Sequence, residues 1–183
     1  MSSCIFTNDN NTRILLVEHP LSQTFASRNE DEVLFRRMHT YLINEGIIKN
    51  NIIDLGAWIG DNSIPWSKSI DSKSIKSKTT IYAIDPSPGN CQFIREMCDH
   101  NHIDNIKVFQ TAISDHCETL STNDDMFHCT FASDETGRNK VNAVSLDHLF
   151  SIKEIENVGY IHLDVEGMEY KVLLGSKQII DTC

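Results

Sequence analysis

The polar and apolar positions of the chain follow two periods, one typical of buried strands and one typical of amphipathic helices. Short apolar runs that end at Gly, Asp or Pro predict strands with both faces buried. The expected strands are residues 13–18, 51–56, 80–85, 106–109 and 159–165. Helices are expected in residues 28–45, from residue 61 onward, in 90–100, from residue 145 and in 166–174. This alternation predicts an α/β fold with a mainly parallel sheet and helices on both faces.

The N-terminal part is expected to form a polar tail and a helix that pack on the main domain. Ser27 and Glu30 have the spacing of a capping box, which predicts a helix start. Apolar residues then recur at helical spacing until Gly46, a residue type that favours a helix end. At 183 residues the chain is long enough for one domain with a substantial core. We therefore expect an N-terminal tail and helix in residues 1–49 and the main domain in residues 50–183.

Two segments lack a helical period, residues 68–78 and residues 115–142. The first is rich in Ser and Lys and has little to bury, so we expect a solvated loop. In the second, Phe127, Cys129 and Phe131 alternate with polar residues and a turn follows. This pattern predicts a β-hairpin insertion.

Charge and cysteine content narrow the range of partners and compartments. The chain has 16 basic and 26 acidic residues, a formal net charge of −10, which disfavours a broad nucleic-acid-binding face. Its apolar runs are shorter than a membrane span and its first residues do not resemble a secretory signal, so we expect neither membrane insertion nor secretion. The six cysteines form no CxxC pair, which favours reduced thiols in the cytoplasm. The histidines show no zinc-ligand spacing, so we expect no metal site.

The first candidate binding site is the glycine-containing loop that follows the strand at 51–56, which includes Gly56 and Gly60 and leads into a helix. Such a bend brings backbone N–H groups and the positive end of a helix dipole toward a bound anion. In dinucleotide-binding proteins the motif is G-x-G-x-x-G, whose second glycine lets the pyrophosphate approach the backbone. Trp58 occupies that position here, so a nicotinamide dinucleotide is disfavoured.

A ligand with a small carboxylate and a separate ribose fits this pattern better. The carboxylate would meet the amides of residues 60–63. Asp85, at the end of the next strand, would accept hydrogen bonds from both ribose hydroxyls. The alternative is that the glycines form only a tight turn and that Asp85 only caps its strand.

Five segments of the chain carry more specific motifs. They are Asp54-Leu-Gly-Ala-Trp-Ile-Gly-Asp61-Asn-Ser, Tyr82-Ala-Ile-Asp-Pro86-Ser-Pro, Thr111-Ala-Ile-Ser-Asp115, Val144-Ser-Leu-Asp147 and Ile161-His-Leu-Asp-Val-Glu-Gly-Met-Glu169. Taken in order, they resemble the FkbM family of S-adenosylmethionine-dependent methyltransferases over roughly residues 50–180. The resemblance implies a Rossmann-like class I methyltransferase fold that binds S-adenosylmethionine.

The resemblance also implies where each part of the cofactor binds. The methionine end would lie on the loop from Gly56 to Gly60, the ribose on Asp85 and the adenine beside Ala112, with Asp164 near the transferable methyl group. The full set of expected cofactor-binding residues is Asp54, Gly56, Ala57, Trp58, Gly60, Asp61, Asn62, Ser63, Asp85, Pro86, Ala112 and Asp164.

Methyl transfer to a hydroxyl requires alignment of the acceptor and a group that takes its proton. Tyr160, His162 and Asp164 alternate along one strand and therefore share a face. We expect Asp164 to orient the cofactor or the acceptor, because a carboxylate at the end of an apolar strand would be poorly solvated without a partner. Glu166 or His162 would take the proton. For His162, a structural hydrogen bond to a neighbour is the alternative.

Three features depart from the family pattern. The family usually has Lys or Arg at the position of His162 and often Glu at the position of Asp85, although either carboxylate can hold a ribose. It also has three further strands after the helix near Gly175, whereas this chain ends at Cys183. We therefore expect the C-terminal strands of the fold to be missing, and the open sheet edge to favour a homo-oligomer.

The function that the sequence favours is O-methylation of a hydroxyl on a small molecule or carbohydrate, the acceptors that the resemblance implies. A second hypothesis is a non-catalytic or degenerate S-adenosylmethionine-binding protein that lacks a complete acceptor site. A nicotinamide-dependent oxidoreductase is the third hypothesis, and Trp58 disfavours it.

Overall fold

The computed structural model describes residues 4–7, 13–28, 33–71, 79–124, 129–131 and 139–182. Its centre is a four-stranded parallel sheet with the order β10-β3-β4-β5. The strands are β10 (Val158–Leu163), β3 (Asn51–Leu55), β4 (Ile81–Asp85) and β5 (Ile106–Gln110). Every residue of β3 and β4 is buried, as expected for apolar runs in the middle of a covered sheet. The predicted α/β fold with a parallel sheet is confirmed.

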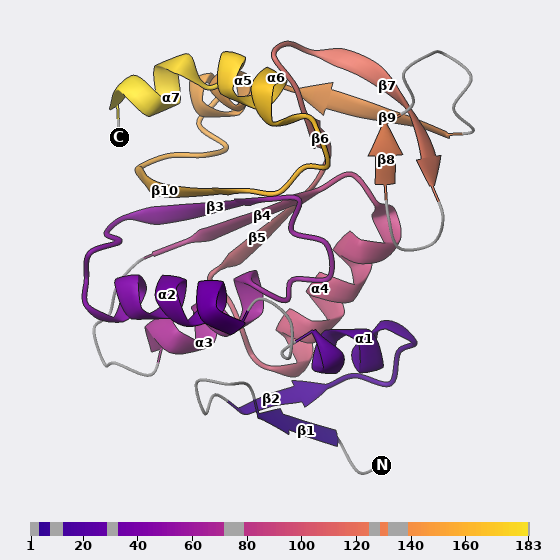
Figure 1. The fold of residues 1–183 in the computed structure, drawn as a ribbon, viewed down its shortest axis with the longest axis vertical. Coiled ribbons are helices and arrows are strands. Elements are labelled where there is room, and N and C mark those ends of the chain that lie inside the picture. The colour runs from indigo at the N-terminus through magenta and orange to yellow at the C-terminus, as the bar shows by residue number, and fades with distance from the viewer. Residues whose placement is uncertain are drawn as a thin grey trace.

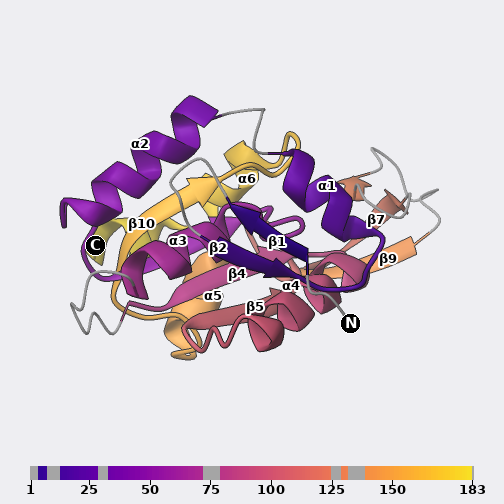
Figure 2. The same cartoon turned by 90° about the horizontal axis from the view of Figure 1, so that it is seen from below.

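Helices cover both faces of this sheet, as predicted (Figure 1). One face carries α5 (Leu146–Ser151), α6 (Glu169–Leu174) and α7 (Lys177–Thr182), and the other carries α2 (Val33–Asn44), α3 (Ser63–Asp71) and α4 (Pro88–His100). Figure 2 shows α2, α3 and α4 spread across the second face. Alternate strand residues pack on opposite faces: Ile53 of β3 packs with Leu146 and Val172, whereas Ile52 packs with Trp66.

The N-terminal segment, expected to begin as a polar tail, instead forms a small antiparallel sheet followed by a helix. They are β1 (Cys4–Thr7), β2 (Arg13–Leu16) and α1 (Leu21–Ser27). Ile14 and Phe25 are buried in one apolar cluster with Phe93 of α4. The Asn101 side chain, at the end of α4, accepts a hydrogen bond from the Leu15 N–H at 2.8 Å and donates one to the Leu15 carbonyl oxygen at 2.8 Å. These contacts attach the N-terminal segment to the face that carries α4.

The predicted start of the helix over residues 28–45 is wrong. Ser27 is the last residue of α1, and its hydroxyl donates to the Thr24 carbonyl oxygen at 3.0 Å instead of capping the next helix. That next helix, α2, begins at Val33. Glu30, the other half of the expected capping box, lies outside the described residues.

Two further boundaries differ from the prediction. The solvated loop expected over residues 68–78 does not include Lys68, because α3 continues to Asp71; residues 72–78 lie outside the described residues. The helix expected from residue 166 begins at Glu169, because the backbone at Glu166 has a φ of 51° and cannot continue a right-handed helix.

A second sheet follows β5 and contains the predicted insertion. Its strands, in the order β6-β9-β7-β8, are β6 (Ala112–Ile113), β9 (Asn139–Val144), β7 (Glu118–Asp124) and β8 (Cys129–Phe131). The antiparallel pair of β7 and β8 confirms the predicted hairpin, although Phe127 lies outside the described residues. The sequence did not predict β9, which pairs antiparallel with β7 and parallel with β6.

The central sheet has β10 at one edge and β5 at the other in the described part of the chain. Across those same residues, no helix combines the length and the apolar character that crossing a membrane requires.

Candidate functional site

The carboxyl ends of the four parallel strands meet at one edge of the central sheet. The first residues beyond these ends are Gly56, Pro86, Thr111 and Asp164. Open parallel sheets bind ligands outside this edge, since the loops there converge from several strands. The structure therefore brings together the glycine loop, Asp85 and the end of β10, which the sequence had placed in separate motifs.

Gly56 allows the ends of β3 and β10 to approach closely. It has a φ of +74°, and a Cβ atom at this position would lie 1.8 Å from the carbonyl oxygen of Asp164. The Asp164 N–H donates to the Leu55 carbonyl oxygen at 3.0 Å, which continues the sheet ladder one residue beyond β10. The glycine loop and Asp164 are thus held together through their backbones.

Gly60 closes the turn over the apolar core. Its N–H donates to the Ala57 carbonyl oxygen at 2.7 Å. A Cβ atom here would meet Ile64 and Ile94 side-chain atoms at 3.1 Å. Gly60 thus serves a tight turn and close packing beneath the loop.

Asp85 joins the loop after β3 to the loop after β4. Its Oδ2 accepts from the Trp58 N–H at 2.9 Å, and its Oδ1 accepts from the Ser87 N–H at 2.9 Å and the Asn90 side-chain amide at 3.1 Å. Burial raises the pKa of this carboxyl to about 6 against the opposing effect of these hydrogen bonds, and the charge of Asp54 raises it further. A carboxylate offers about four acceptor positions, so roughly one, rather than the two expected for a pair of ribose hydroxyls, is left for a ligand.

A cleft of about 450 Å³ lies beside Asp85, over the ends of β4 and β5. Its walls are Pro86, Pro88, Gln110, Thr111 and residues 139–142 of β9. The predicted Pro86 lines this cleft, while the predicted Ala112 is buried in β6.

The expected cofactor-binding residues fall into two groups, those with solvent-accessible surface and those that are buried. Gly56, Trp58, Asn62 and Pro86 are half-buried and Asp164 is exposed. The buried ones are Asp54, Ala57, Gly60, Asp61, Ser63, Asp85 and Ala112. The accessible group forms the surface of the site, and the buried group sets its shape.

Arg28 at the end of α1 reaches this loop, which the sequence did not predict. Its Nε lies 3.6 Å from a carboxylate oxygen of Asp61, and its guanidinium carbon lies 5.0 Å from the centre of the Trp58 ring. No motif marks Arg28, because the contact depends on how α1 packs. The N-terminal segment therefore contributes a positive charge to the edge of the site.

Half-buried His162 and buried Asp54 form a hydrogen-bonded pair under the same edge. They are register partners in the parallel strands β10 and β3, and His162 Nδ1 lies 2.8 Å from Asp54 Oδ1. The Ser63 hydroxyl donates to Asp54 Oδ2. Asp54 and Ser63 have no exposed surface. Burial acts to lower the pKa of His162, but the hydrogen bond and charge of Asp54, with the charges of Asp164 and Asp61, raise it above its ordinary value.

The aromatic side chains around His162 come from three elements. His39 of α2 and Trp66 of α3 have ring centres 5.6 Å from that of His162, in edge-on arrangements. Tyr160 of β10 lies 5.5 Å from His39. Burial and the positive charge of His162 lower the pKa of His39, against the opposing charge of Asp54. The sequence did not single out His39 or Trp66, whose roles depend on helix packing.

The other two catalytic candidates are solvent-exposed. Asp164 and Glu166 both lie at the surface, just beyond the end of β10. The expectation that Asp164 would be poorly solvated is wrong, because the strand ends before this residue and its side chain reaches water. Their part in catalysis stays a prediction.

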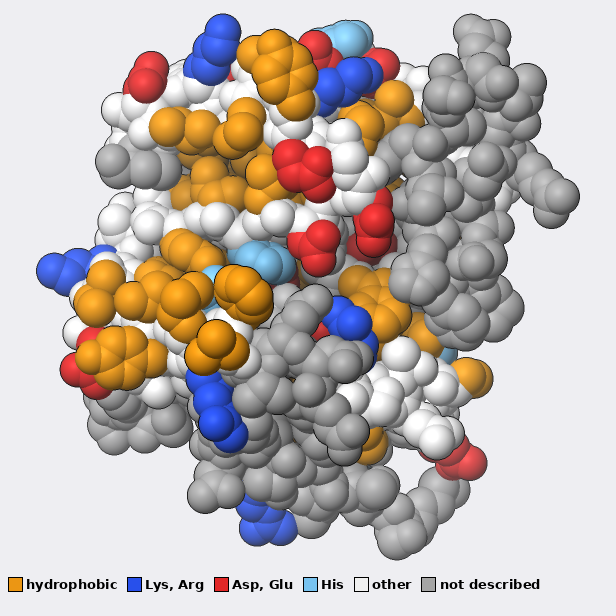
Figure 3. Space-filling model, viewed as in Figure 1, with side chains coloured by type: hydrophobic (Ala, Val, Ile, Leu, Met, Phe, Trp, Pro, Cys, Tyr) orange, Lys and Arg blue, Asp and Glu red, His pale blue; other side chains and the backbone are white. Residues whose placement is uncertain are grey.

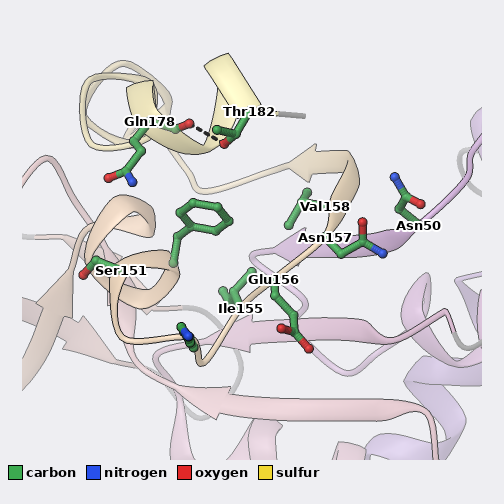
Figure 4. A pocket seen from close by; sticks show the side chains of 10 residues that line it. Asn50, Ser151, Ile155, Glu156, Asn157, Val158, Gln178 and Thr182 are labelled. Atoms are coloured by element: carbon green, nitrogen blue, oxygen red, sulfur yellow. Dashed lines mark hydrogen bonds between the residues drawn. The ribbon is translucent and has the colours of Figure 1, made fainter.

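Two other features lie outside this edge. Asp115, His116 and Glu118 each place one potential metal-ligand atom within 4.8 Å of the others, but Ser114 and Lys171 already bond Glu118. A cavity of about 610 Å³ lies at the opposite, amino end of the strands, where its lining includes Asn157 and Gln178 (Figure 4).

One solved structure supports the fold, and a second is only a weaker match. The solved structure of methyltransferase FkbM from Methylobacillus flagellatus KT is 18% identical with a TM-score of 0.52, and the match covers 73% of this chain and 30% of that one. The S-adenosylhomocysteine-bound methyltransferase PaMTH1 from Podospora anserina is 17% identical with a TM-score of 0.38, over 50% of this chain and 36% of that one. The chain thus spans well under half the length of either structure. No curated protein matches it.

The family comparison covers most of the chain. The family described as "Methyltransferase FkbM domain" matches residues 54–183, which include the glycine loop, Asp85 and the end of β10. The fold is accordingly the Rossmann-like fold of class I methyltransferases, as predicted. The chain belongs to the FkbM methyltransferase family, whose methyl donor is S-adenosylmethionine.

Proposed function

We propose that this methyltransferase transfers the methyl group of S-adenosylmethionine to a hydroxyl oxygen of a small molecule or carbohydrate. The observation that carries the proposal is the hydrogen bond from the Trp58 N–H to Asp85, 2.9 Å long. It joins the glycine loop to the strand end beside the 450 Å³ cleft, so one continuous surface can meet both ends of the cofactor.

The accessible residues fit the parts of the cofactor in order. The half-buried loop at Gly56, Trp58 and Asn62 would receive the methionine end. Asp85 would bind the ribose through its remaining acceptor position. The cleft walled by Pro86 and Thr111 would take the adenine.

The acceptor would approach the end of β10. S-adenosylmethionine, when bound, supplies an electrophilic methyl group, so the protein has to align the hydroxyl and accept its proton. Asp164 is exposed there and would orient the acceptor, while Glu166 and His162 are the groups within reach that could hold the proton.

An apolar surface near this edge is consistent with an organic acceptor. Leu34, Phe35, Met38 and Tyr41 of α2 are exposed, at 78%, 62%, 45% and 58%. Figure 3 shows hydrophobic side chains gathered over α2. They lie on the helix that also supplies His39 beside His162. We propose that α2 and the β7–β9 insertion shape the acceptor pocket.

Three statements about the setting of the protein belong to the same proposal. We infer that the acceptor is not a nucleic acid, from the net charge of −10. We infer a cytoplasmic location with reduced thiols, consistent with free Cys91, Cys98 and Cys117 among the described residues. We infer self-association through the β10 edge, because unpaired strand edges favour pairing with another chain.

A methyl-transfer screen tests the proposed function. The purified chain is incubated with methyl-labelled S-adenosylmethionine and a panel of hydroxylated small molecules and sugars. Label transferred to at least one acceptor supports the proposal. Cofactor binding without transfer to any acceptor favours the second hypothesis, a non-catalytic S-adenosylmethionine-binding protein, while binding of NAD alone would favour an oxidoreductase.

A further inference from the structure

We propose that His162 is the catalytic base and that buried Asp54 is a positioning residue that holds its imidazole with the proton on Nδ1. This inference rests on the proposed function and deepens it, because it selects one of the two candidate proton acceptors, Glu166 and His162. It also gives Asp54 a role other than direct contact with the cofactor.

The surroundings of Asp54 favour this role. Its side chain has no exposed surface, and each carboxylate oxygen has a protein partner: His162 at Oδ1 and Ser63 at Oδ2. A buried carboxylate is costly unless it is paired and hydrogen-bonded, so these two contacts account for its presence. Asp54 therefore acts on the site through His162.

The pairing determines which nitrogen of His162 can accept a proton. A carboxylate only accepts hydrogen bonds, so Nδ1 carries the hydrogen and donates it to Asp54 at 2.8 Å. In a neutral imidazole the other nitrogen, Nε2, is then the acceptor. A carboxylate that orients a histidine in this way also stabilises the imidazolium that forms during proton transfer.

The neighbouring groups keep the imidazole in place and favour its protonated form. Four titratable groups interact with it: Asp54 from β3, His39 from α2, Asp164 just beyond β10 and Asp61 from the glycine loop, while Tyr160 of β10 lies against His39. Burial acts to lower the pKa of both histidines; at His162 the three carboxylates outweigh it and raise the pKa, whereas at His39 the positive charge of His162 lowers the pKa further. Of the two, His162 is therefore the histidine whose protonated form is favoured by its surroundings. Its side chain is 20% exposed, so it is not sealed from the site.

Proton transfer and methyl transfer involve two bonds broken and two bonds formed. The O–H bond of the acceptor breaks and an Nε2–H bond forms on His162, which becomes an imidazolium paired with the Asp54 carboxylate. The acceptor oxygen forms the new bond to the methyl carbon, and the electron pair of the methyl–sulfur bond stays with the sulfur of the donor. The imidazolium then releases its proton to water.

NMR of protein labelled with ¹⁵N-histidine tests the arrangement without an acceptor. The His162 signal is assigned with His162→Gln and followed through a pH titration in the unmodified protein, in Asp54→Asn and in the control Asp104→Asn, which removes an exposed carboxylate elsewhere. We expect the Nδ1–H tautomer for neutral His162. We expect a lower His162 pKa in Asp54→Asn and no change in Asp104→Asn. An Nε2–H tautomer in the unmodified protein, or an Asp54→Asn titration that matches the control, would overturn the proposal.

Binding and turnover separate this proposal from the proposed function. Titration with S-adenosylhomocysteine should give similar affinities for the unmodified protein and the control Asp104→Asn. In Asp54→Asn, loss of affinity with an unchanged His162 signal would make Asp54 a cofactor ligand and overturn its positioning role. With an acceptor from the screen, His162→Gln should lower kcat by about 10²-fold or more, the range for loss of a general base. A kcat within a few-fold of normal would remove His162 from catalysis.

If the unmodified protein bound no cofactor, the proposed function would fail. The tautomer of His162 would still show whether Nδ1 donates its hydrogen to Asp54. Should Asp54→Asn not fold, the tautomer of the unmodified protein decides alone.

Discussion

Replacing Gly56 with Ala should destabilise the protein strongly, because this position joins β3 to β10. A φ of +74° costs a residue with a Cβ atom about 1–2 kcal/mol. The new Cβ would also lie 1.8 Å from the Asp164 carbonyl oxygen. Relief to an ordinary carbon–oxygen contact of about 3.3 Å requires the two strand ends to separate by about 1.5 Å.

That separation has a further cost. It would break the 3.0 Å hydrogen bond from the Asp164 N–H to the Leu55 carbonyl oxygen, worth about 1 kcal/mol. It would also loosen the packing of Val165, whose Cγ1 lies 3.6 Å from the new atom. Together these effects predict a loss of about 3–4 kcal/mol in the free energy of unfolding.

Urea unfolding followed by circular dichroism measures the loss, with Gly46→Ala as the matched control. Gly46 has a similar φ of +66°, but a Cβ atom added there would meet no atom within 4 Å, so this variant should lose only the backbone cost of about 1–2 kcal/mol. With a slope of about 2 kcal/mol per molar urea, the midpoint should fall by about 1.5–2 M for Gly56→Ala and by about 0.5–1 M for the control. Equal midpoints for the two variants would refute the close approach of Gly56 to Asp164.

Three further predictions concern pH, the N-terminal segment and the thiols. The pKa of Asp85 is raised to about 6 from 3.8, so its contribution to stability is full below pH 3.8 and is lost as the pH rises through about 6. The stability of Asp85→Asn relative to the unmodified protein should therefore increase by about 2–2.5 kcal/mol between pH 4 and 7. A pH-independent difference would contradict this. Asn101→Ala should lower the free energy of unfolding by about 2–4 kcal/mol, because the N–H and the carbonyl of Leu15 both lose their hydrogen-bond partner. An unchanged urea midpoint would contradict the attachment of β2 to α4. Burial raises the pKa of Cys91 and Cys98 to about 12, whereas Cys117 is exposed. Iodoacetamide at pH 8 should therefore modify Cys117 faster than Cys91 and Cys98, as measured by peptide mass spectrometry. Equal rates at these three thiols would be inconsistent with the fold.

The parts of the fold that could be predicted are those with a strong local signal. The strands β3, β4 and β10 are apolar runs that end at Gly or Asp. Both faces of β3 and β4 are buried, which requires such a continuous apolar run. Helix α1 was missed because residues 21–27 are mostly polar and its buried residues are Leu21, Ser22 and Phe25, of which Ser22 is polar. The capping motif at Ser27 was misleading, because that hydroxyl serves the end of α1.

The sequence predicted only those parts of the site that lie within a single local motif. The glycine loop and Asp85 are marked by residue type and by their position after strands. The pairing of Asp54 with His162 joins residues 108 apart in the sequence, and it follows from the register of β3 and β10. Arg28 and His39 reach the site through helix packing, which no local pattern encodes.

Calorimetric titration with S-adenosylhomocysteine tests the central claim, that one surface at the carboxyl edge of the sheet binds the cofactor. The account predicts saturable binding at one site per chain, weakened in Asp85→Asn and unchanged in the distant control Asp104→Asn, with no heat from NAD. Absence of binding to the unmodified protein, or affinity that does not depend on Asp85, would contradict it.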